Sequence, residues 1–148
     1  MTSIKFHIIE KKDIINIIPL LSKLNQKTPI ELLKSRVIEM SNQNYECIGI
    51  YDNQKLIGIC GLWYMTRHYL GNSVEPDHVY INEEYRGRGI GKELFVFLEN
   101  YLKTKGIEAL ELNTYTENRK SHKFYYNEGY EIYGYHFVKI IREDGKFY

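Results

Sequence analysis

Cysteine is scarce in this chain of 148 residues, which has only Cys47 and Cys60. Each lies in its own apolar stretch, and the spacing is unlike that of metal ligands. We therefore expect two buried free thiols, not a disulfide, a metal site or a thiol nucleophile. The two signs of charge nearly balance, with 20 Lys and Arg against 19 Asp and Glu. This balance gives no general electrostatic reason to bind nucleic acid or an anionic membrane surface.

Long apolar runs are missing as well. None reaches the roughly 20 residues that a membrane-spanning helix needs. Residues 1–5 also lack the apolar stretch of a secretory signal, so we expect a cytoplasmic protein. The apolar fraction of 43% is that of an ordinary globular protein, and the length suits a single domain, residues 1–148, with a substantial core.

Hydrophobic periodicity predicts a chain that mixes strands and helices. The expected elements are strands over 4–10, 45–51, 56–65, 74–81, 107–114, 130–133 and 135–141, and helices over 13–25, 29–40, 89–104 and about 118–129. We expect Asp13 and Thr28 to cap the first two helices, and Pro19 to kink or break the first. Gly134 separates the last two strands, which would form a closing hairpin.

A glycine-rich basic segment follows the strand that ends at Ile81. Its residues are Arg86, Gly87, Arg88, Gly89, Ile90, Gly91 and Lys92. Glycine adopts backbone angles closed to other residues and lets a ligand approach the main chain closely. The first amides of the following helix have no intrahelical partner, and with the helix dipole they favour a phosphate group. Residues 86–92, the phosphate cradle, are therefore predicted to bind a pyrophosphate.

Two familiar phosphate motifs do not fit the cradle. A P-loop fails because Arg86 replaces the first glycine and Glu93 follows Lys92 where a hydroxyl residue belongs. A dinucleotide fingerprint fails because the third glycine comes one residue too soon and the motif lies past the middle of the chain. The remaining alternative is a glycine turn that only joins a strand to a helix, which three glycines interleaved with two arginines disfavour.

A second polar motif lies on the short helix near residue 120. The spacing of Asn118, Ser121, His122 and Tyr125 places these side chains on one side of that helix. Such a stripe fits a ligand-facing surface beside the cradle. It also fits a solvated helix face whose packing comes from Phe124.

Together these features resemble the GNAT superfamily of acetyl-CoA-dependent N-acyltransferases. The resemblance rests on the order of the elements, on Arg-x-x-Gly-x-Gly at 86–91, and on Asn118-x-x-Ser121-x-x-Phe124-Tyr125-x-x-x-Gly129-Tyr130. It covers essentially the whole chain. It implies an α/β (α+β) fold: a mixed, mostly antiparallel sheet of about seven strands with flanking helices and a parallel pair splayed at the cofactor site. It also implies acetyl-CoA as cosubstrate and no metal.

The resemblance assigns roles to single residues. Those assigned to the cofactor are Val79, Tyr80, Ile81, the cradle residues 86–92, Asn118 and Tyr125. Backbone groups of residues 79–81 would bind the pantetheine arm, the cradle amides the diphosphate, and Asn118 the pantetheine. Tyr125 matches the general acid that protonates the departing CoA thiolate. Tyr126, about 100° further round the helix, is the weaker candidate.

Acetyl transfer to an amine also requires a base. An amine with a pKa near 10.4 is neutral in only about one molecule in 2,500 at pH 7. Glu75 and Asp77 are two residues apart and so are expected on one strand face with Val79 and Ile81. Either carboxylate could take the proton, directly or through water, or could merely attract a cationic substrate. His78, expected on the opposite face, and His122 are lesser candidates.

These expectations lead to an N-acetyltransferase that transfers acetyl to a primary amine by direct attack, without an acyl-enzyme. The acidic pair slightly favours a small cationic amine over a protein lysine or N-terminus as acceptor. A non-catalytic acyl-CoA-binding sensor is the alternative from another class, and Tyr125 argues against it. We expect no nucleic-acid or membrane partner. The closing hairpin and residues 142–148 could pair in a homodimer.

Overall fold

The computed structural model describes residues 3–148. The chain divides into two compact units, one ending at Leu112 and the other beginning at Asn113. Each unit is described by itself. The single domain over residues 1–148 stays a prediction.

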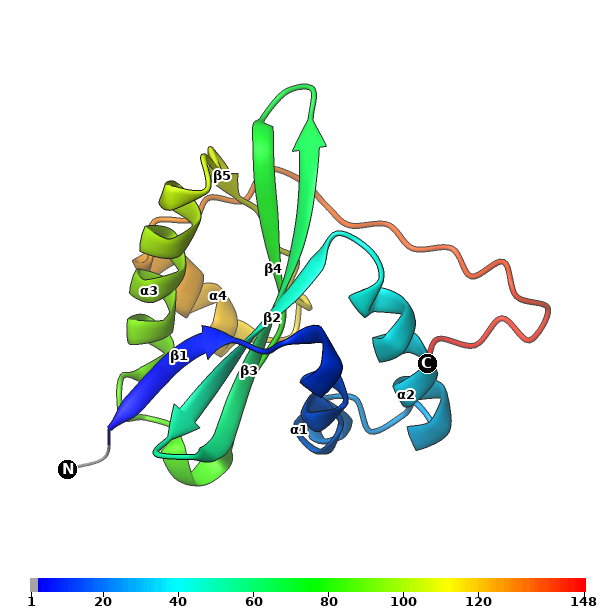
Figure 1. The fold of residues 1–148 in the computed structure, drawn as a ribbon. Helices are drawn as coiled ribbons and strands as arrows, with labels where there is room; N and C mark the ends of the chain where they lie inside the picture. Colours follow the sequence, from blue (N-terminus) through cyan, green and yellow to red (C-terminus); the bar gives the residue numbers. More distant parts are fainter. Residues whose placement is uncertain (1–2) are drawn as a thin grey trace. The chain divides into compact units, whose positions relative to one another are not determined.

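The first unit is built on one sheet of five strands, ordered β1-β2-β3-β4-β5 (Figure 1). The strands are β1 (Ile4–Ile8), β2 (Tyr45–Asp52), β3 (Lys55–Arg67), β4 (Gly71–Ile81) and β5 (Ala109–Leu110). The first four pair antiparallel with their neighbours, and β5 pairs parallel to β4. The predicted mixed, mostly antiparallel sheet with one parallel pair is therefore confirmed.

Helices cover both faces of this sheet. They are the 3-10 helix η1 (Lys11–Ile17), α1 (Ile18–Leu24), α2 (Ile30–Ser41), the 3-10 turn η2 (Glu83–Tyr85) and α3 (Ile90–Thr104). In Figure 1, α3 lies on one side of the sheet and α1 and α2 lie on the other. The second unit contains α4 (Arg119–Asn127). Among residues 3–148, no helix is both long and apolar enough to span a bilayer.

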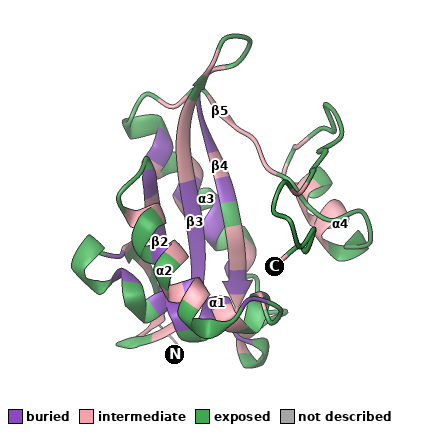
Figure 2. Cartoon of the chain, turned by 90° about the vertical axis from the view of Figure 1, so that its right-hand side faces the viewer, coloured by how far each residue is buried: buried purple, intermediate pink, exposed green. Residues whose placement is uncertain are grey.

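The two faces of the sheet bury different clusters. The α1–α2 side joins twelve buried residues into one core, among them Ile17 and Val37 from the helices and Cys47 and Ile59 from the sheet. On the other side, α3 buries Leu94, Leu98 and Leu102, which recur every four residues and so lie on one face of the helix. Figure 2 shows the middle of β3 as buried, as expected for a strand packed on both faces.

The predicted helix over residues 13–25 is wrong in its first half. Residues 11–17 form a 3-10 helix, and α-helix begins only at Ile18. Pro19 explains the change, since it has no N–H to donate and fits only the first turn of an α-helix. Asp13 makes no side-chain cap; its backbone N–H donates to the Glu10 carbonyl at 2.8 Å.

The predicted cap of the second helix is also wrong. Pro29, not Thr28, is the N-cap residue of α2, and no side chain caps this end. The Thr28 hydroxyl is buried and makes no hydrogen bond within the described chain. The helix begins one residue later than expected, because the Pro29 carbonyl accepts the first α-helical hydrogen bond, from the Leu33 N–H at 2.9 Å.

The sheet has five strands in the described residues, not the predicted seven. The strand expected over 107–114 is reduced to Ala109–Leu110, and the expected hairpin over 130–141 forms no strand. In that stretch Tyr133 is 93% exposed and Phe137 is 91% exposed. Alternating apolar residues need a paired neighbour to become a strand, and a lone two-stranded hairpin is only marginally stable.

Candidate functional site

The cradle uses two of its three glycines for their backbone freedom. Gly87 has φ +73°, and Gly89, the N-cap of α3, has φ +81°. A Cβ added at either position would meet no atom within 4 Å, so conformation rather than space excludes other residues. Gly91 lies inside the first turn of α3 and is not among the glycines with positive φ. Gly91 therefore does not use the backbone freedom that glycine offers.

The N-terminus of α3 presents free backbone donors. The first α-helical hydrogen bond there runs from the Glu93 N–H to the Gly89 carbonyl at 3.1 Å. The amides of Ile90, Gly91 and Lys92 come before that bond and so lack intrahelical partners. Gly87, Arg88 and Gly89 are exposed. Amides without intrahelical partners at the positive end of a 15-residue helix, next to an exposed turn, suit an anion.

Both arginines of the cradle are held by the main chain and by aromatic rings. The Arg86 Nε donates to the Ile81 carbonyl at 2.8 Å, and its guanidinium lies 5.2 Å from the centre of the Tyr80 ring. Arg88 donates to the Glu84 carbonyl at 2.6 Å and lies 5.2 Å from the centre of the Tyr85 ring. The arginine charges are therefore fixed beside the turn.

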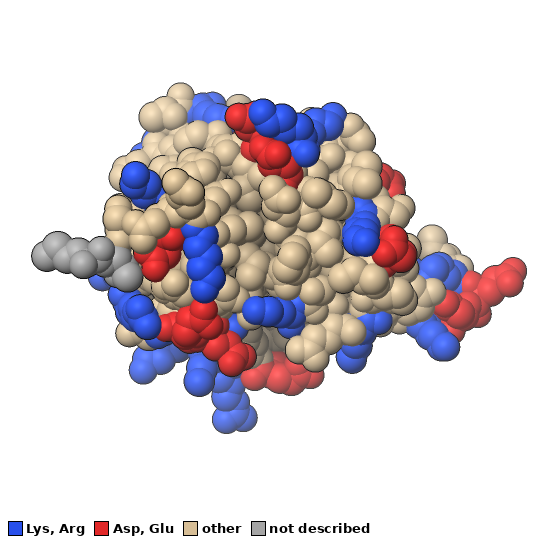
Figure 3. Space-filling view, turned by 60° about the horizontal axis from the view of Figure 1, so that its bottom comes forward, with Lys and Arg blue, Asp and Glu red and all other residues tan. Residues whose placement is uncertain are grey.

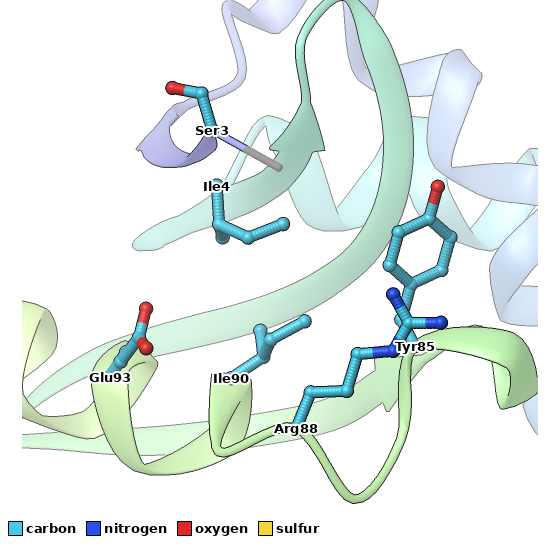
Figure 4. A pocket seen from close by; sticks show the side chains of 6 residues that line it. All are labelled: Ser3, Ile4, Tyr85, Arg88, Ile90 and Glu93. Atoms are coloured by element: carbon cyan, nitrogen blue, oxygen red, sulfur yellow. The ribbon is translucent and has the colours of Figure 1, made fainter. Parts of the chain in front are cut away.

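Tyr85 is a supporting residue that the sequence analysis missed. Its ring also lies beneath the Lys55 ammonium, 5.7 Å from the ring centre. Lys55 in turn pairs with Glu84 at 3.3 Å. Tyr85 and Arg88 also line a hollow of about 340 Å³, where their side chains lie side by side (Figure 4). An aromatic residue three positions before Arg88 was the signal in the sequence.

The edge of β4 that leads to the cradle is open on one side. The ladder with β5 holds two pairs, Ser73 with Ala109 and Val74 with Leu110. Within the described chain, residues 75–81 of β4 pair only with β3. Next to the paired residues, the Glu111 carboxylate accepts hydrogen bonds from Arg67 Nε at 2.9 Å and Ser73 Oγ at 2.7 Å. The parallel strands thus part after Val74, and the ladder between β4 and β5 extends no further.

A β-bulge changes which side chains share a face of β4. Asp77 pairs with Gly61 and Tyr80 with Ile59, so Cys60 alone lies opposite two residues of β4. Glu75 and Asp77 therefore share a face with Tyr80, not with Val79 and Ile81 as expected. Local alternation cannot anticipate a bulge, because the extra residue is defined by the partner strand.

His78, one of the two residues in the bulge, has φ +36°. Its ring lies over Gly61, where an added Cβ would clash with it. Gly61 pairs with Asp77, so His78 lies on the face of Asp77 and not on the opposite one. The predicted orientation of His78 is therefore wrong. Its side chain is only 7% exposed.

Asp77 and Tyr45 hold the His78 ring between them. Nδ1 lies 3.3 Å from Asp77 Oδ2, and Nε2 lies 2.7 Å from the Tyr45 hydroxyl. Burial would lower the pKa of His78, but Asp77 and the thiol of Cys47 raise it to about 9. Burial would raise the pKa of Asp77, yet hydrogen bonds from His78 and Trp63 lower it to about 2. Both groups are therefore charged at neutral pH.

An acidic and aromatic surface lies beside this pair. The Trp63 Nε1 donates to Asp77 Oδ2 at 3.1 Å, and Glu75 pairs across the strands with Trp63. Two carboxylates next to an indole ring can attract an organic cation. On the face that Figure 3 draws, basic and acidic side chains lie interspersed.

The helix of the second unit begins at a side-chain cap. Asn118 caps α4, because its Oδ1 accepts a hydrogen bond from the Ser121 backbone N–H at 3.3 Å. His122 Nε2 lies 2.9 Å from the Tyr115 carbonyl oxygen. Tyr125 is half-buried and packs edge-on against Tyr130, with ring centres 5.5 Å apart. The functional roles assigned to Asn118 and Tyr125 stay predictions.

Both free thiols are buried, as expected. Cys47 is 0% exposed and lies in the same core cluster as Tyr45. Burial raises the pKa of the Cys60 thiol well above its usual value. A neutral buried thiol is a poor nucleophile.

The fold and sequence are similar to those of known acetyltransferases. An aminoglycoside N-acetyltransferase, AAC(6')-Iy in complex with CoA, superimposes with a TM-score of 0.81 over 96% of this chain and 97% of that chain, at 16% identity. Spermidine N(1)-acetyltransferase of Thermoplasma acidophilum is 29% identical over 69% of this chain and 60% of its own length. Aminoalkylphosphonate N-acetyltransferase of Salmonella typhimurium is 28% identical over 60% of this chain and 58% of its own length. The chain thus spans about three fifths of these two relatives.

A family model covers the region that carries both motifs. The model of the acetyltransferase (GNAT) family matches residues 18–130, which include the phosphate cradle, the open edge of β4 and helix α4. This confirms the resemblance drawn from the two motifs. The chain belongs to the acetyltransferase (GNAT) family.

Proposed function

We propose that this protein is an acetyl-CoA-dependent N-acetyltransferase that transfers acetyl to a primary amine by direct attack. The observation that carries the proposal is that three features follow one another along the chain. They are the open edge of β4, a turn with two glycines of positive φ, and the N-terminus of α3. An extended amide-bearing arm can pair with a strand edge, and a diphosphate suits free helix amides. CoA carries both groups. Family membership supports the same conclusion.

The proposal assigns a role to each part of the site. Backbone groups of residues 79–81 bind the pantetheine arm and polarise the thioester carbonyl. The cradle amides bind the diphosphate, with Arg86, Arg88 and Lys92 adding charge. Asn118 contacts pantetheine, and the Tyr125 hydroxyl protonates the departing thiolate. No metal takes part, and no thiol acyl intermediate forms.

The acceptor is proposed to be a small cationic amine. Glu75 and Asp77 lie on one face with the Trp63 indole, an arrangement that favours a cation. Similar proteins are named for spermidine, an aminoalkylphosphonate and an aminoglycoside, all of which carry amines. Glu75 accepts the amine proton, directly or through water. A protein lysine or N-terminus is the competing acceptor, and a non-catalytic acyl-CoA sensor is the competing class.

A CoA-release assay over an amine panel tests the activity. The panel holds a polyamine, an aminoglycoside, an aminoalkylphosphonate and peptides with a free lysine or N-terminus. Release with a small amine supports the proposal, and release only with the peptides favours the competing acceptor. Calorimetric binding of acetyl-CoA without release on any amine favours the sensor. The absence of any heat with CoA would overturn the cofactor assignment.

Two glycines of α3 provide a matched test of the cradle. Gly89 and Gly106 both have positive φ and open space around an added Cβ, but they flank opposite ends of the helix. Alanine at either position introduces a similar strain of about 1–2 kcal/mol. We expect Gly89→Ala to weaken CoA binding at least about tenfold, because its Cβ enters the space where phosphate approaches. Gly106→Ala should leave CoA binding unchanged.

A further inference from the structure

The bulge in β4 holds a backbone conformation that needs support. His78 has φ +36°, a left-handed value that residues with a Cβ rarely adopt. Conformations of this kind persist where the surrounding structure over-determines them, and they cluster at functional sites. The bulge lies three residues before the end of β4, and η2 then leads from β4 to the cradle.

Three residues hold His78 in this conformation. The two oxygens of Asp77 bind both ends of the residue: Oδ1 accepts the His78 backbone N–H at 2.8 Å, and Oδ2 lies 3.3 Å from the ring Nδ1. Tyr45 fixes the far side of the ring, with its hydroxyl 2.7 Å from Nε2. Gly61 leaves the space that the ring fills. We call Asp77, Tyr45 and Gly61 the His78 clamp.

The same contacts make Asp77 a poor base. Its carboxylate accepts from the His78 backbone, the His78 ring and the Trp63 indole, so both oxygens are occupied. These donors stabilise the charged form and lower its pKa to about 2. A general base should have a pKa near the working pH, which this carboxylate does not approach.

The bulge also determines how the first arginine of the cradle is held. Because of the extra residue, Tyr80 turns into the core on the α1–α2 side, where it is 8% exposed. The Arg86 guanidinium lies on the Tyr80 ring, and its Nε donates to the carbonyl of the next residue, Ile81. A bulge that relaxed would move both supports of Arg86.

We propose that Asp77 is a positioning residue and not the base: with Tyr45 and Gly61 it holds His78 in the bulge, and the bulge in turn positions Arg86 for the cofactor diphosphate. This inference rests on the proposed function for the identity of the ligand. The clamp itself is a property of the protein without ligand. It leaves Glu75 as the carboxylate of β4 that meets the acceptor.

The experiment compares Asp77→Asn, Tyr45→Phe and Gly61→Ala with wild type and with Glu75→Gln. Three quantities are measured: amide hydrogen exchange at residues 79–81 without ligand, the Kd for CoA by calorimetry, and kcat at saturating acetyl-CoA. Tyr45→Phe removes a single hydrogen bond and keeps the ring, so it remains informative if the harsher Gly61→Ala variant does not fold. Gly106→Ala serves as the glycine control.

We expect the clamp variants to exchange faster at residues 79–81 and to bind CoA about tenfold more weakly, with kcat changed less than about threefold. Glu75→Gln should show the reverse, with a lower kcat and an unchanged Kd. A loss of kcat of about a hundredfold or more in Asp77→Asn at unchanged Kd would assign Asp77 as the base and overturn the inference. Unchanged amide exchange in all clamp variants would also overturn it. If wild type binds no CoA, the proposed function fails, whereas the exchange data still decide whether the clamp exists.

Discussion

The hydroxyl of Tyr85 donates a hydrogen bond to Oδ2 of Asp52 at 2.9 Å. This bond joins the turn before α3 to the hairpin between β2 and β3, two segments 33 residues apart in the sequence. Because the Arg88 guanidinium lies on the same Tyr85 ring, the hairpin indirectly supports the cradle.

Substitutions of Tyr85 should therefore weaken cofactor binding in two steps. Tyr85→Phe removes the bond to Asp52 and keeps the ring, so we expect a loss of CoA affinity of a few fold. Tyr85→Leu also removes the ring beneath Arg88 and should cost about tenfold or more. Calorimetry with CoA measures both. Tyr69→Leu, at a 69% exposed tyrosine in another turn, is the control and should bind like wild type. Equal affinity of all four proteins would contradict the supporting role.

The two neighbouring tyrosines of α4 allow a matched test of the proposed acid. We expect Tyr125→Phe to lower kcat by about 10²–10⁴-fold, the range that a general acid typically contributes, with little change in CoA affinity. Tyr126, 57% exposed on the same helix, should tolerate phenylalanine without loss. Steady-state kinetics with the best amine of the panel measures the difference. Similar kcat values for the two variants would remove Tyr125 from the mechanism.

The charged His78 should make folding stability depend on pH. Its pKa is raised from 6.5 to about 9 in the folded chain, so the stabilisation is fully present below pH 6.5 and is lost as pH rises to about 9. A shift of this size corresponds to roughly 3 kcal/mol. Urea unfolding between pH 6 and 9.5 should show wild type losing more stability than His78→Gln. Parallel curves would mean that His78 is not charged in the folded protein.

Asp77 has the opposite dependence. The pKa of Asp77 is lowered from 3.8 to about 2 in the folded chain. Its contribution to folding stability is therefore present above pH 3.8 and is lost as the pH falls from 3.8 to about 2. His78→Gln removes the charged partner of Asp77, and Tyr45→Phe removes the hydrogen bond that holds the His78 ring. Acid unfolding should therefore begin at a higher pH in both variants than in wild type. Far-UV circular dichroism between pH 5 and 2 measures the midpoint. An unchanged midpoint in His78→Gln would contradict the ion pair.

Helix α3 offers a test of the core that positions the cradle. Leu98 is fully buried, whereas Val96 on the same helix is 52% exposed. We expect Leu98→Ala to lower the free energy of unfolding by about 2–5 kcal/mol, because a cavity remains beneath the helix. Val96→Ala should change it by no more than about 0.5 kcal/mol. Urea denaturation measures both, and equal losses would mean that α3 does not pack as described.

Much of the cradle could be read from the sequence because its determinants are local. Glycine is the residue that tolerates the left-handed angles of positions 87 and 89, and the apolar spacing of 90–102 specifies a helix that must begin just after them. The free, buried state of Cys47 and Cys60 was predictable for a similar local reason, since each lies in its own apolar stretch.

The errors in the predicted strands all involve a partner strand that lies elsewhere in the chain. Alternation along residues 130–141 predicted strands, but no strand forms there, since a strand exists only with a neighbour to pair with. Alternation along β4 placed Val79 with Asp77 and His78 on the opposite face, and the pairing with β3 reversed both assignments.

The sequence alone thus determined where an anion can meet the backbone, because glycine conformation and helix ends depend on neighbouring residues. The tertiary structure decided which side chains lie beside the proposed anion site. The bulge at His78 depends on the space above Gly61, the hydroxyl of Tyr45 and the register against β3. None of these is a neighbour of His78 in sequence, and cross-strand contacts of this kind form only once the sheet has its register.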